Sequence, residues 1–482
     1  MAWRDAFLFR AGLITPLLLL TTLAFIEGCA HNYSYQIFPG EAPQDIFPQI
    51  KNRDQLWLSG NEAGVELRVF YAAGEKELAE EALEEVKKPP RFLHEATGIT
   101  QNDFAGFYLY PTLDDGTTPY FTTNGKGSFT GVFLYRKGEP LLSIYHNREW
   151  LNGSYVHELT HGFLSGVKLD DRWLEDGIPE YLTREFAQYQ DPELARGDYR
   201  LTPSLIALSR AKLKPWDMRD YKEIEKQLST DPALAQWLGE KMAWHYAAAE
   251  ELMRRWLVAA QANGIQAPLQ DLLRRVRARG GSIGWKATEE LAQAQTGKPI
   301  EELAHVTSEE LAAAQAKAWE DRASSNLGAR VHALSVLSAL GIPNAQSSDD
   351  LLPVFSIPPD LSDVKRGWVW QVFQQGGTAV ATVNDAAIAK EVVERARAGW
   401  GEDGYRFVPP ELWRVIAATD RPLAIGQLVA IVNRSDNNLS LRDRANEVLK
   451  ALTGQDVGWS AAESPTKRQQ AAERWKAAQL GH

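Results

Sequence analysis

The string His157-Glu158-Leu159-Thr160-His161 constrains this chain more than any other part of its sequence. On an α-helix, side chains four positions apart lie on one face, so His157 and His161 can both reach a single metal ion. Glu158 lies about 100° further round the helix, where its carboxylate can reach a water molecule on that metal without coordinating the metal itself. The string therefore predicts a helix that presents a metal site for hydrolysis.

The residues around this string support a helix with two different faces. Four apolar residues recur at near-helical spacing within 151–164 and leave the two histidines and the glutamate on another face. They are Tyr155, Val156, Leu159 and Phe163. A solvated helix with two surface histidines is the alternative, because a His-Glu-x-x-His string also arises by chance.

A carboxylate-rich segment follows, Trp173-Leu174-Glu175-Asp176-Gly177-Ile178-Pro179-Glu180-Tyr181. We expect a turn here that leads into a second helix. Catalytic zinc commonly has three protein ligands, often including a carboxylate, and keeps a fourth position for water. The two segments together resemble the gluzincin metallopeptidases, in particular the peptidase-MA-like group. In that group a His-Glu-x-x-His helix and a short loop precede Trp-Leu-x-Glu-Gly-x-x-Glu-Tyr.

The resemblance implies Zn²⁺ held by His157, His161 and the residue before the glycine. That residue is Asp176, where the family has the longer Glu. Glu180 lies one helical turn further on and is the competing ligand, since the eighteen residues between it and His161 match the larger aminopeptidase branch. With Asp176 as the ligand, Glu180 would accept a hydrogen bond from a ligand imidazole. An acidic first turn that complements a helix dipole would explain one of these carboxylates without any metal.

The resemblance also implies a mechanism of peptide hydrolysis. Zinc lowers the pKa of its bound water towards about 7, and Glu158 takes the proton and later passes it to the leaving amine. A long helix expected at 243–260 begins Trp244-His245-Tyr246, and the family has a comparable Tyr-bearing helix. The hydroxyl of Tyr246 or the neutral ring of His245 would then stabilise the oxyanion, with core packing as the alternative role for either residue.

The first 29 residues have the composition of an export signal. Arg4 and Arg10 come before an apolar stretch at 11–25. This stretch is shorter than the roughly 20 residues of a membrane span. The stretch leads to Cys29 in a context that resembles a bacterial lipobox, where the thiol is acylated. An ordinary signal peptide or an uncleaved anchor is the alternative.

Cysteine usage favours the lipoprotein interpretation, because Cys29 is the only cysteine in 482 residues. Ala30 follows it, in place of the Asp that commonly retains lipoproteins at the inner membrane. We therefore expect an exported protein anchored in the cell envelope by lipid, at the outer membrane and facing the periplasm.

Composition sets three further limits. The formal net charge of −11, without a basic stripe, argues against nucleic acid as a partner. A single cysteine excludes an intramolecular disulfide, so the exported chain has to rely on its core. With 482 residues, of which 44% are hydrophobic, the chain can form two or three domains of ordinary size.

The predicted order of elements gives an α+β fold class: a zincin-like N-terminal lobe with a mixed sheet and the active-site helix, then a helical lobe and an all-α HEAT-like array. We divide the chain into a signal at 1–29, a tether at 30–60, a metallopeptidase domain at 61–322 and a helical domain at 323–482. The sheet lobe is expected to contain strands at 65–71 and 104–110, a helix at 75–86 and a hairpin of 131–135 with 141–145.

Further helices are expected beyond the sheet lobe. Residues 201–208 and 216–228 form a connector, and helices follow at 269–278, 287–296, 300–320, 327–337, 386–398, 410–418, 423–433, 441–452 and 465–480. The stretch 442–475 resembles the closing unit of HEAT-like repeats in bacterial envelope proteins, with a plain helical bundle as the alternative.

These observations predict a zinc metallopeptidase that acts on peptides or proteins. The rival class is a binding lipoprotein in which the shorter Asp176 has impaired the metal site and the helical array holds a protein partner.

Overall fold

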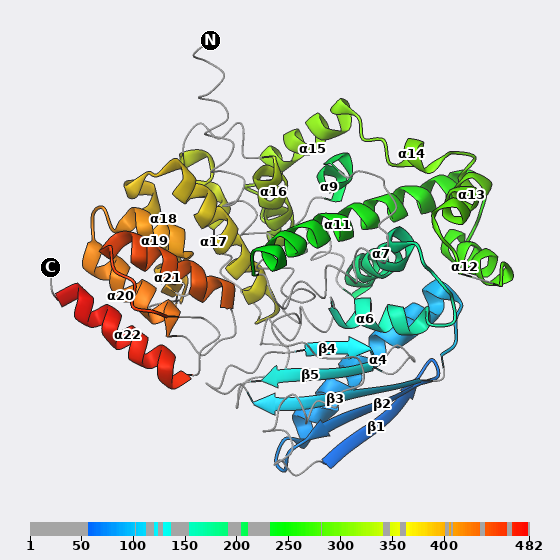
Figure 1. The fold of residues 1–482 in the computed structure, drawn as a ribbon, viewed down its shortest axis with the longest axis horizontal. Coiled ribbons are helices and arrows are strands. Elements are labelled where there is room, and N and C mark those ends of the chain that lie inside the picture. Colours follow the sequence, from blue (N-terminus) through cyan, green and yellow to red (C-terminus); the bar gives the residue numbers. More distant parts are fainter. Residues whose placement is uncertain are drawn as a thin grey trace.

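The structure is a computed structural model that describes residues 56–101, 103–111, 120–123, 129–135, 154–190, 204–210, 232–280, 282–340, 348–356, 363–400, 404–405, 408–433, 439–459 and 465–480. The predicted signal at 1–29, and the part of the predicted tether before residue 56, lie outside these residues. Among the described residues, no helix is long and apolar enough to cross a membrane. Figure 1 shows a sheet on one side of the molecule and helices over the rest.

A five-stranded mixed sheet forms the N-terminal part, in the order β1-β2-β3-β5-β4. The strands are β1 (Leu56–Glu62), β2 (Val65–Tyr71), β3 (Asp103–Pro111), β4 (Tyr120–Thr123) and β5 (Phe129–Tyr135). The central strands β2, β3 and β5 are parallel, and β1 and β4 pair antiparallel at the two edges. Side chains alternate between core and outer face along β2, as expected for a strand with one face in a core. The strands predicted at 65–71 and 104–110 and the mixed sheet are confirmed.

One expectation for this part of the chain was wrong. The tether cannot extend to residue 60, because β1 begins at Leu56.

Strand β1 turns into β2 through Ala63 and Gly64, which have φ values of 51° and 86°. A side chain at Gly64 would also meet the carbonyl oxygen of Gln101, with its Cβ only 2.0 Å away. The sequence lacks the Asn-Gly or Asp-Gly pair that usually indicates such a hairpin.

Strand β5 pairs antiparallel with β4, which precedes it in the chain. The strand predicted at 141–145 lies outside the described residues, so the hairpin of 131–135 with 141–145 stays a prediction.

Helix α4 (Lys76–Thr97) packs on β1 and β2. It was predicted to end near residue 86, but it continues through Pro89 and Pro90. Proline inside a helix costs about 3 kcal/mol, because it removes a hydrogen bond and clashes with the preceding turn. Both prolines are buried together with Leu93, so their burial helps to offset this local cost.

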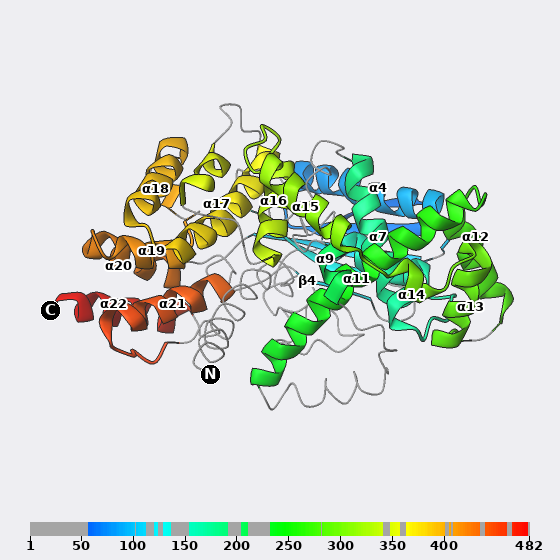
Figure 2. The same ribbon diagram turned by 90° about the horizontal axis from the view of Figure 1, so that it is seen from above.

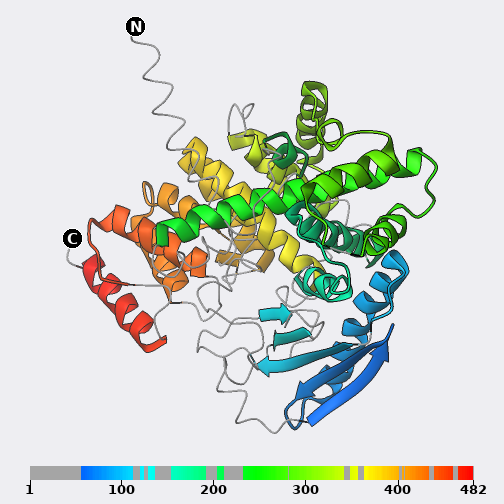
Figure 3. The ribbon, with the colours of Figure 1, turned by 45° about the vertical axis from the view of Figure 1, so that its right-hand side comes forward.

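Helices α6 (Ser154–Phe163) and α7 (Arg172–Gln190) lie between the sheet and α11 (Pro232–Ala262) (Figures 1 and 3). α6 contacts β4 and β5, α7 packs on α6, and α11 packs on α7 and on the short α9 (Ser204–Arg210). The helix predicted at 243–260 is therefore the C-terminal part of a longer one. The predicted connector at 216–228 lies outside the described residues.

The next helices are α12 (Pro268–Ala278), α13 (Trp285–Thr296), α14 (Ile300–Leu303) and α15 (Ser308–Asp321). The last two replace the single helix predicted at 300–320. The break is explained by a capping box, in which Thr307 accepts from the backbone of Glu310 while the Glu310 side chain accepts from the backbone of Thr307.

The C-terminal part is an all-α array with its own apolar core. Its elements are α16 (Leu327–Ala339), two short 3₁₀ helices (Ser348–Asp350 and Leu352–Phe355), α17 (Asp363–Val383), α18 (Ala386–Trp400), α19 (Pro410–Ile416), α20 (Arg421–Val432), α21 (Leu439–Thr453) and α22 (Pro465–Leu480). From α17 onwards each helix packs on the next, and α17, α19 and α21 also pack in series. Figure 2 shows α17 to α22 at the opposite end of the molecule from α12 to α14.

A buried ion pair fastens this array, because Arg444 Nε donates to Glu411 Oε1 at 2.8 Å. Burial alone would raise the pKa of Glu411, but the charge and hydrogen bonds of Arg444 keep that pKa below its usual range.

The predicted order of an α+β lobe followed by an array of helices is confirmed by these elements.

Candidate metal site

The metal-site helix α6 is held by its apolar face. The four residues predicted to form that face are at most 2% exposed, and they are Tyr155, Val156, Leu159 and Phe163. Each fully buried side chain of this size contributes roughly 1.5–3 kcal/mol. The Tyr155 hydroxyl donates to the carbonyl oxygen of Val86 at 2.9 Å, and its ring meets Phe107 edge-on. α6 is therefore fixed to both α4 and the sheet, which orients the histidines on its other face.

Helix α7 starts earlier than the sequence predicted, because Asp171 caps it. Asp171 Oδ1 accepts from the backbone N–H of Trp173 at 3.1 Å, and its carbonyl oxygen accepts from the N–H groups of Leu174 and Glu175. The expected carboxylate-rich turn is thus the first part of the helix. Asp176 and Glu180 both lie within α7, one turn apart on the same face.

His157, His161 and Asp176 form a group that could hold a metal ion. One ligand atom from each lies within 4.8 Å of the others, and His157 and Asp176 are almost fully buried. The two Nε2 atoms are 3.1 Å apart. Two nitrogens on one tetrahedral zinc lie about 3.3 Å apart, since each Zn–N distance is about 2.0–2.1 Å. The donor set and its spacing therefore fit a metal ion of this size.

Glu180 contacts the other side of the His157 ring. Its Oε1 lies 2.7 Å from His157 Nδ1, and both side chains are buried. A carboxylate at this place favours the tautomer with its proton on Nδ1 and leaves the Nε2 lone pair towards His161 and Asp176. Of the two carboxylates that the sequence left open, Asp176 belongs to the group that could hold a metal ion, and Glu180 contacts the far nitrogen of His157.

The other predicted site residues lie close to this group. Glu158 is partly exposed, whereas His157 beside it is buried. Tyr246 is half-buried, with its ring centroid 5.8 Å from that of His157. His245 is buried, and its Nε2 lies 3.6 Å from Asp176 Oδ2. His245 therefore contacts the carboxylate of Asp176, one of the three residues that could hold a metal ion.

No family model matches the chain, and no curated protein matches it. The functional conclusion therefore rests on the three possible metal ligands, on their burial and on the contacts that support them.

Sequence reasoning missed the part played by Gly177, which lies next to Asp176 inside α7. A Cβ on Gly177 would lie 2.9 Å from the carbonyl oxygen of Ala249, so the glycine permits the close approach of α7 to α11. Glycine inside a helix is itself a signal of such an approach.

We expect Gly177→Ala to lower the free energy of unfolding by about 1–3 kcal/mol, because the added methyl group collides with backbone. Gly426→Ala is the matched control, since Gly426 is inside helix α20 with nothing within 4 Å of its Cβ position. There alanine should stabilise by about 0.5–1 kcal/mol. Denaturant unfolding of both variants measures the difference, and equal effects would refute the close-approach explanation.

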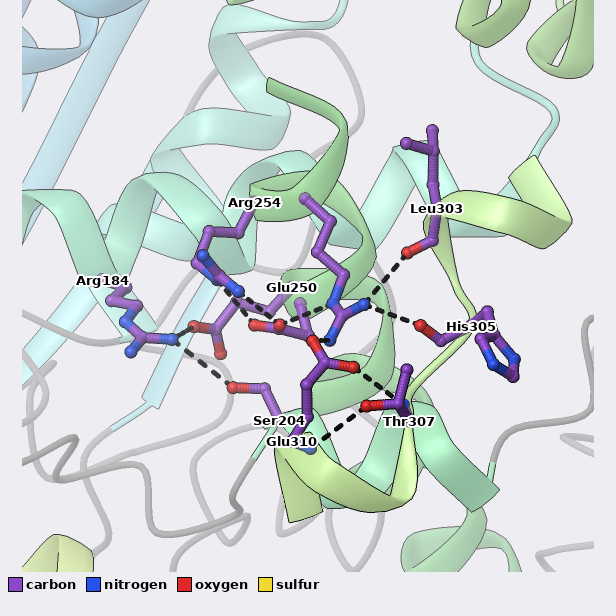
Figure 4. A network of polar contacts seen from close by, with 10 residues as sticks. Arg184, Ser204, Glu250, Arg254, Leu303, His305, Thr307 and Glu310 are labelled. Carbon is purple, nitrogen blue, oxygen red and sulfur yellow. Dashed lines mark hydrogen bonds and ion pairs between the residues drawn. The ribbon is translucent and has the colours of Figure 1, made fainter. Parts of the chain in front are cut away.

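Two buried acidic residues of α11 belong to one polar network, and Glu250 links this helix to its neighbours (Figure 4). Glu250 Oε1 accepts from Arg184 of α7 at 2.7 Å, and the same arginine reaches Ser204 of α9. Glu251 accepts from Arg254 and Arg255. Burial alone would raise the pKa of Glu251, but these two arginines outweigh burial and hold the pKa below its usual range.

Arg255 extends this network to the segment before α15. It donates to Glu310 Oε1 at 2.6 Å and to the carbonyl oxygen of His305 at 2.9 Å. α11 is therefore tied to α7 and α9 at Glu250, within two turns of His245 and Tyr246, and to α15 at Arg255, within three turns. These ties limit how far the two residues can move from the candidate metal site.

Proposed function

We propose that the protein is a zinc metallopeptidase of the gluzincin type. The observation that carries this proposal is the group of His157, His161 and Asp176, of which His157 and Asp176 are buried. The partly exposed Glu158 lies on the same helix as the histidines, and Glu180 contacts His157. Two imidazoles and one carboxylate are the ligand set of many catalytic zinc sites, in which a fourth position stays open.

The chemistry of the donors favours zinc over the hard cations. Magnesium and calcium prefer oxygen ligands, whereas imidazole nitrogen suits zinc and other late transition metals. Bound zinc would supply a Lewis acid and would acidify water at this place. His157 and His161 hold the ion from α6 and Asp176 from α7, so the relative position of these two helices decides the quality of the site.

Glu158 is the proposed general base. Its carboxylate takes a proton from the attacking water and returns it to the nitrogen of the leaving amine. Tyr246 is the proposed hydrogen-bond donor to the developing oxyanion, because it is half-buried and its ring lies beside His157. Glu180 orients His157 and does not touch the substrate.

The position of the edge strand β4 favours a polypeptide as the substrate. Among the described strands its one partner is β5, and it packs against α6. An extended peptide can add to such an edge through backbone hydrogen bonds, and here it would lie next to the metal-site helix. We propose that β4 binds the substrate backbone.

We further propose that lipid on Cys29 anchors the enzyme in the cell envelope, at the outer membrane and facing the periplasm. The C-terminal array α17 to α22 is proposed to be HEAT-like, since its helices pack in series, and to bind a protein partner.

Peptide cleavage tests the proposed activity. The full-length protein, purified in mild detergent and loaded with zinc, should hydrolyse members of a mixed peptide library, as read by mass spectrometry. Cleavage should stop on chelation and return with added zinc. A protein that binds zinc tightly but leaves the whole library intact would instead belong to the class of binding lipoproteins.

A further inference from the structure

His245 occupies a place beside Asp176 that its position in the sequence does not indicate. It lies on α11, far along the chain from α7, and its Nε2 atom is 3.6 Å from Asp176 Oδ2. Both side chains are almost fully buried. The distance is longer than a hydrogen bond, so the contact acts through the charge of the carboxylate and the polarity of the ring.

The His245 ring is held on its other sides by residues at the start of α7. The ring of Trp173 lies against it, with centroids 4.5 Å apart. The carboxylate of Asp171, which caps α7, is buried and interacts electrostatically with His245. His245 is thus enclosed between the first turn of α7 and the carboxylate of Asp176, and only 5% of it is exposed.

A buried carboxylate needs polar partners for both of its oxygens, since an unsatisfied buried charge is costly. His245 places a polar ring nitrogen beside Oδ2 of Asp176. Aspartate is one methylene shorter than the glutamate expected at this position, so its carboxylate has less freedom to find the ion. A fixed polar neighbour limits the rotation of that carboxylate and so favours one orientation over others.

Each of the two supporting contacts of the site joins a carboxylate and an imidazole, but the two groups exchange roles between the contacts. A carboxylate, Glu180, supports the ligand imidazole of His157. An imidazole, His245, supports the ligand carboxylate of Asp176. We propose that His245 is a positioning residue that holds Asp176 in its metal-binding orientation and takes no part in the chemistry on the substrate. This inference rests on the proposed metal site.

Zinc affinity tests the inference, measured on the full-length protein by competition with a chromophoric chelator. His245→Phe keeps the packing against Trp173 but removes the polar edge, so we expect the zinc dissociation constant to rise 10–100-fold. His245→Gln places an amide N–H near the position of Nε2 and should recover most of the affinity. His245→Asn has a shorter side chain that does not reach Asp176 and should resemble the Phe variant.

Val258→Ala is the matched control, because Val258 is an exposed residue of the same helix. Its zinc affinity should equal that of wild type. The visible spectrum of the cobalt-loaded protein gives a second readout, since it follows the geometry of the ligands. It should change in the Phe and Asn variants and stay close to wild type in the Gln variant.

The Gln and Asn pair keeps the test decisive if the Phe variant does not fold. Wild-type affinity and an unchanged cobalt spectrum in the Phe or Asn variant would overturn the positioning role. A wild-type protein that binds no zinc would overturn the metal site itself, and the two failures are therefore distinguishable.

Discussion

Asp176→Ala should abolish tight zinc binding, whereas Glu180→Ala should weaken it only about 10–100-fold. The difference follows from geometry, because Asp176 belongs to the group of three ligand atoms and Glu180 contacts the far nitrogen of His157. Loss of a ligand removes one of three bonds to the ion. Loss of the supporting carboxylate leaves all three ligands but frees the His157 ring to rotate.

Titration of both variants with zinc, by calorimetry or chelator competition, gives this ranking. Glu185→Gln is a suitable control, since it changes a partly buried carboxylate of the same helix that is not part of the group. If Glu180→Ala abolished binding and Asp176→Ala only weakened it, the ligand assignment would move to Glu180.

Glu158→Gln should lose peptidase activity by about 10²–10⁴-fold and keep its zinc. The amide is nearly the same size as the carboxylate but cannot accept a proton from water at neutral pH. His157 and His161 are unchanged, so the metal should stay bound with wild-type affinity.

Rates of peptide hydrolysis and zinc content, measured on the same preparation, separate these two effects. Glu290→Gln provides the control, because Glu290 forms an exposed ion pair with Arg279 that contributes little to stability. A Glu158→Gln variant that cleaves peptides at the wild-type rate would remove Glu158 from the mechanism.

The local sequence predicted those elements in which the periodic pattern and the tertiary environment agree. The apolar residues of α6 recur at helical spacing and are buried, and the alternation along β2 matches its two faces. The spacing of His157 and His161 likewise predicts two imidazoles on one face of a helix, and their Nε2 atoms lie 3.1 Å apart.

The errors lie where distant contacts override local signals. Gly177 and Pro179 inside α7 look like a turn, yet the helix continues because α11 packs close to the glycine. Helix α17 was missed for a similar reason. It contains Gly376 and Gly377, whose added Cβ atoms would lie 2.7 Å from Phe355 and from Pro409.

The same contrast between local sequence patterns and distant contacts applies to the candidate site. The ligand positions follow from spacing within two neighbouring segments, so the sequence could propose His157, His161 and Asp176. The contact of His245 with Asp176 joins α11 to α7 and depends on how these helices pack, which no local pattern encodes. For the same reason, the sequence left His245 between oxyanion stabilisation and core packing and could not place it beside Asp176.

Metal content is the most direct measurement for this account, because every proposed role at the site depends on a bound ion. The full-length protein, loaded with zinc and then freed of excess metal, should retain about one zinc ion per chain. Elemental analysis of wild type beside the Asp176→Ala variant gives the result. Wild-type protein without stoichiometric zinc after loading would contradict the proposed metallopeptidase.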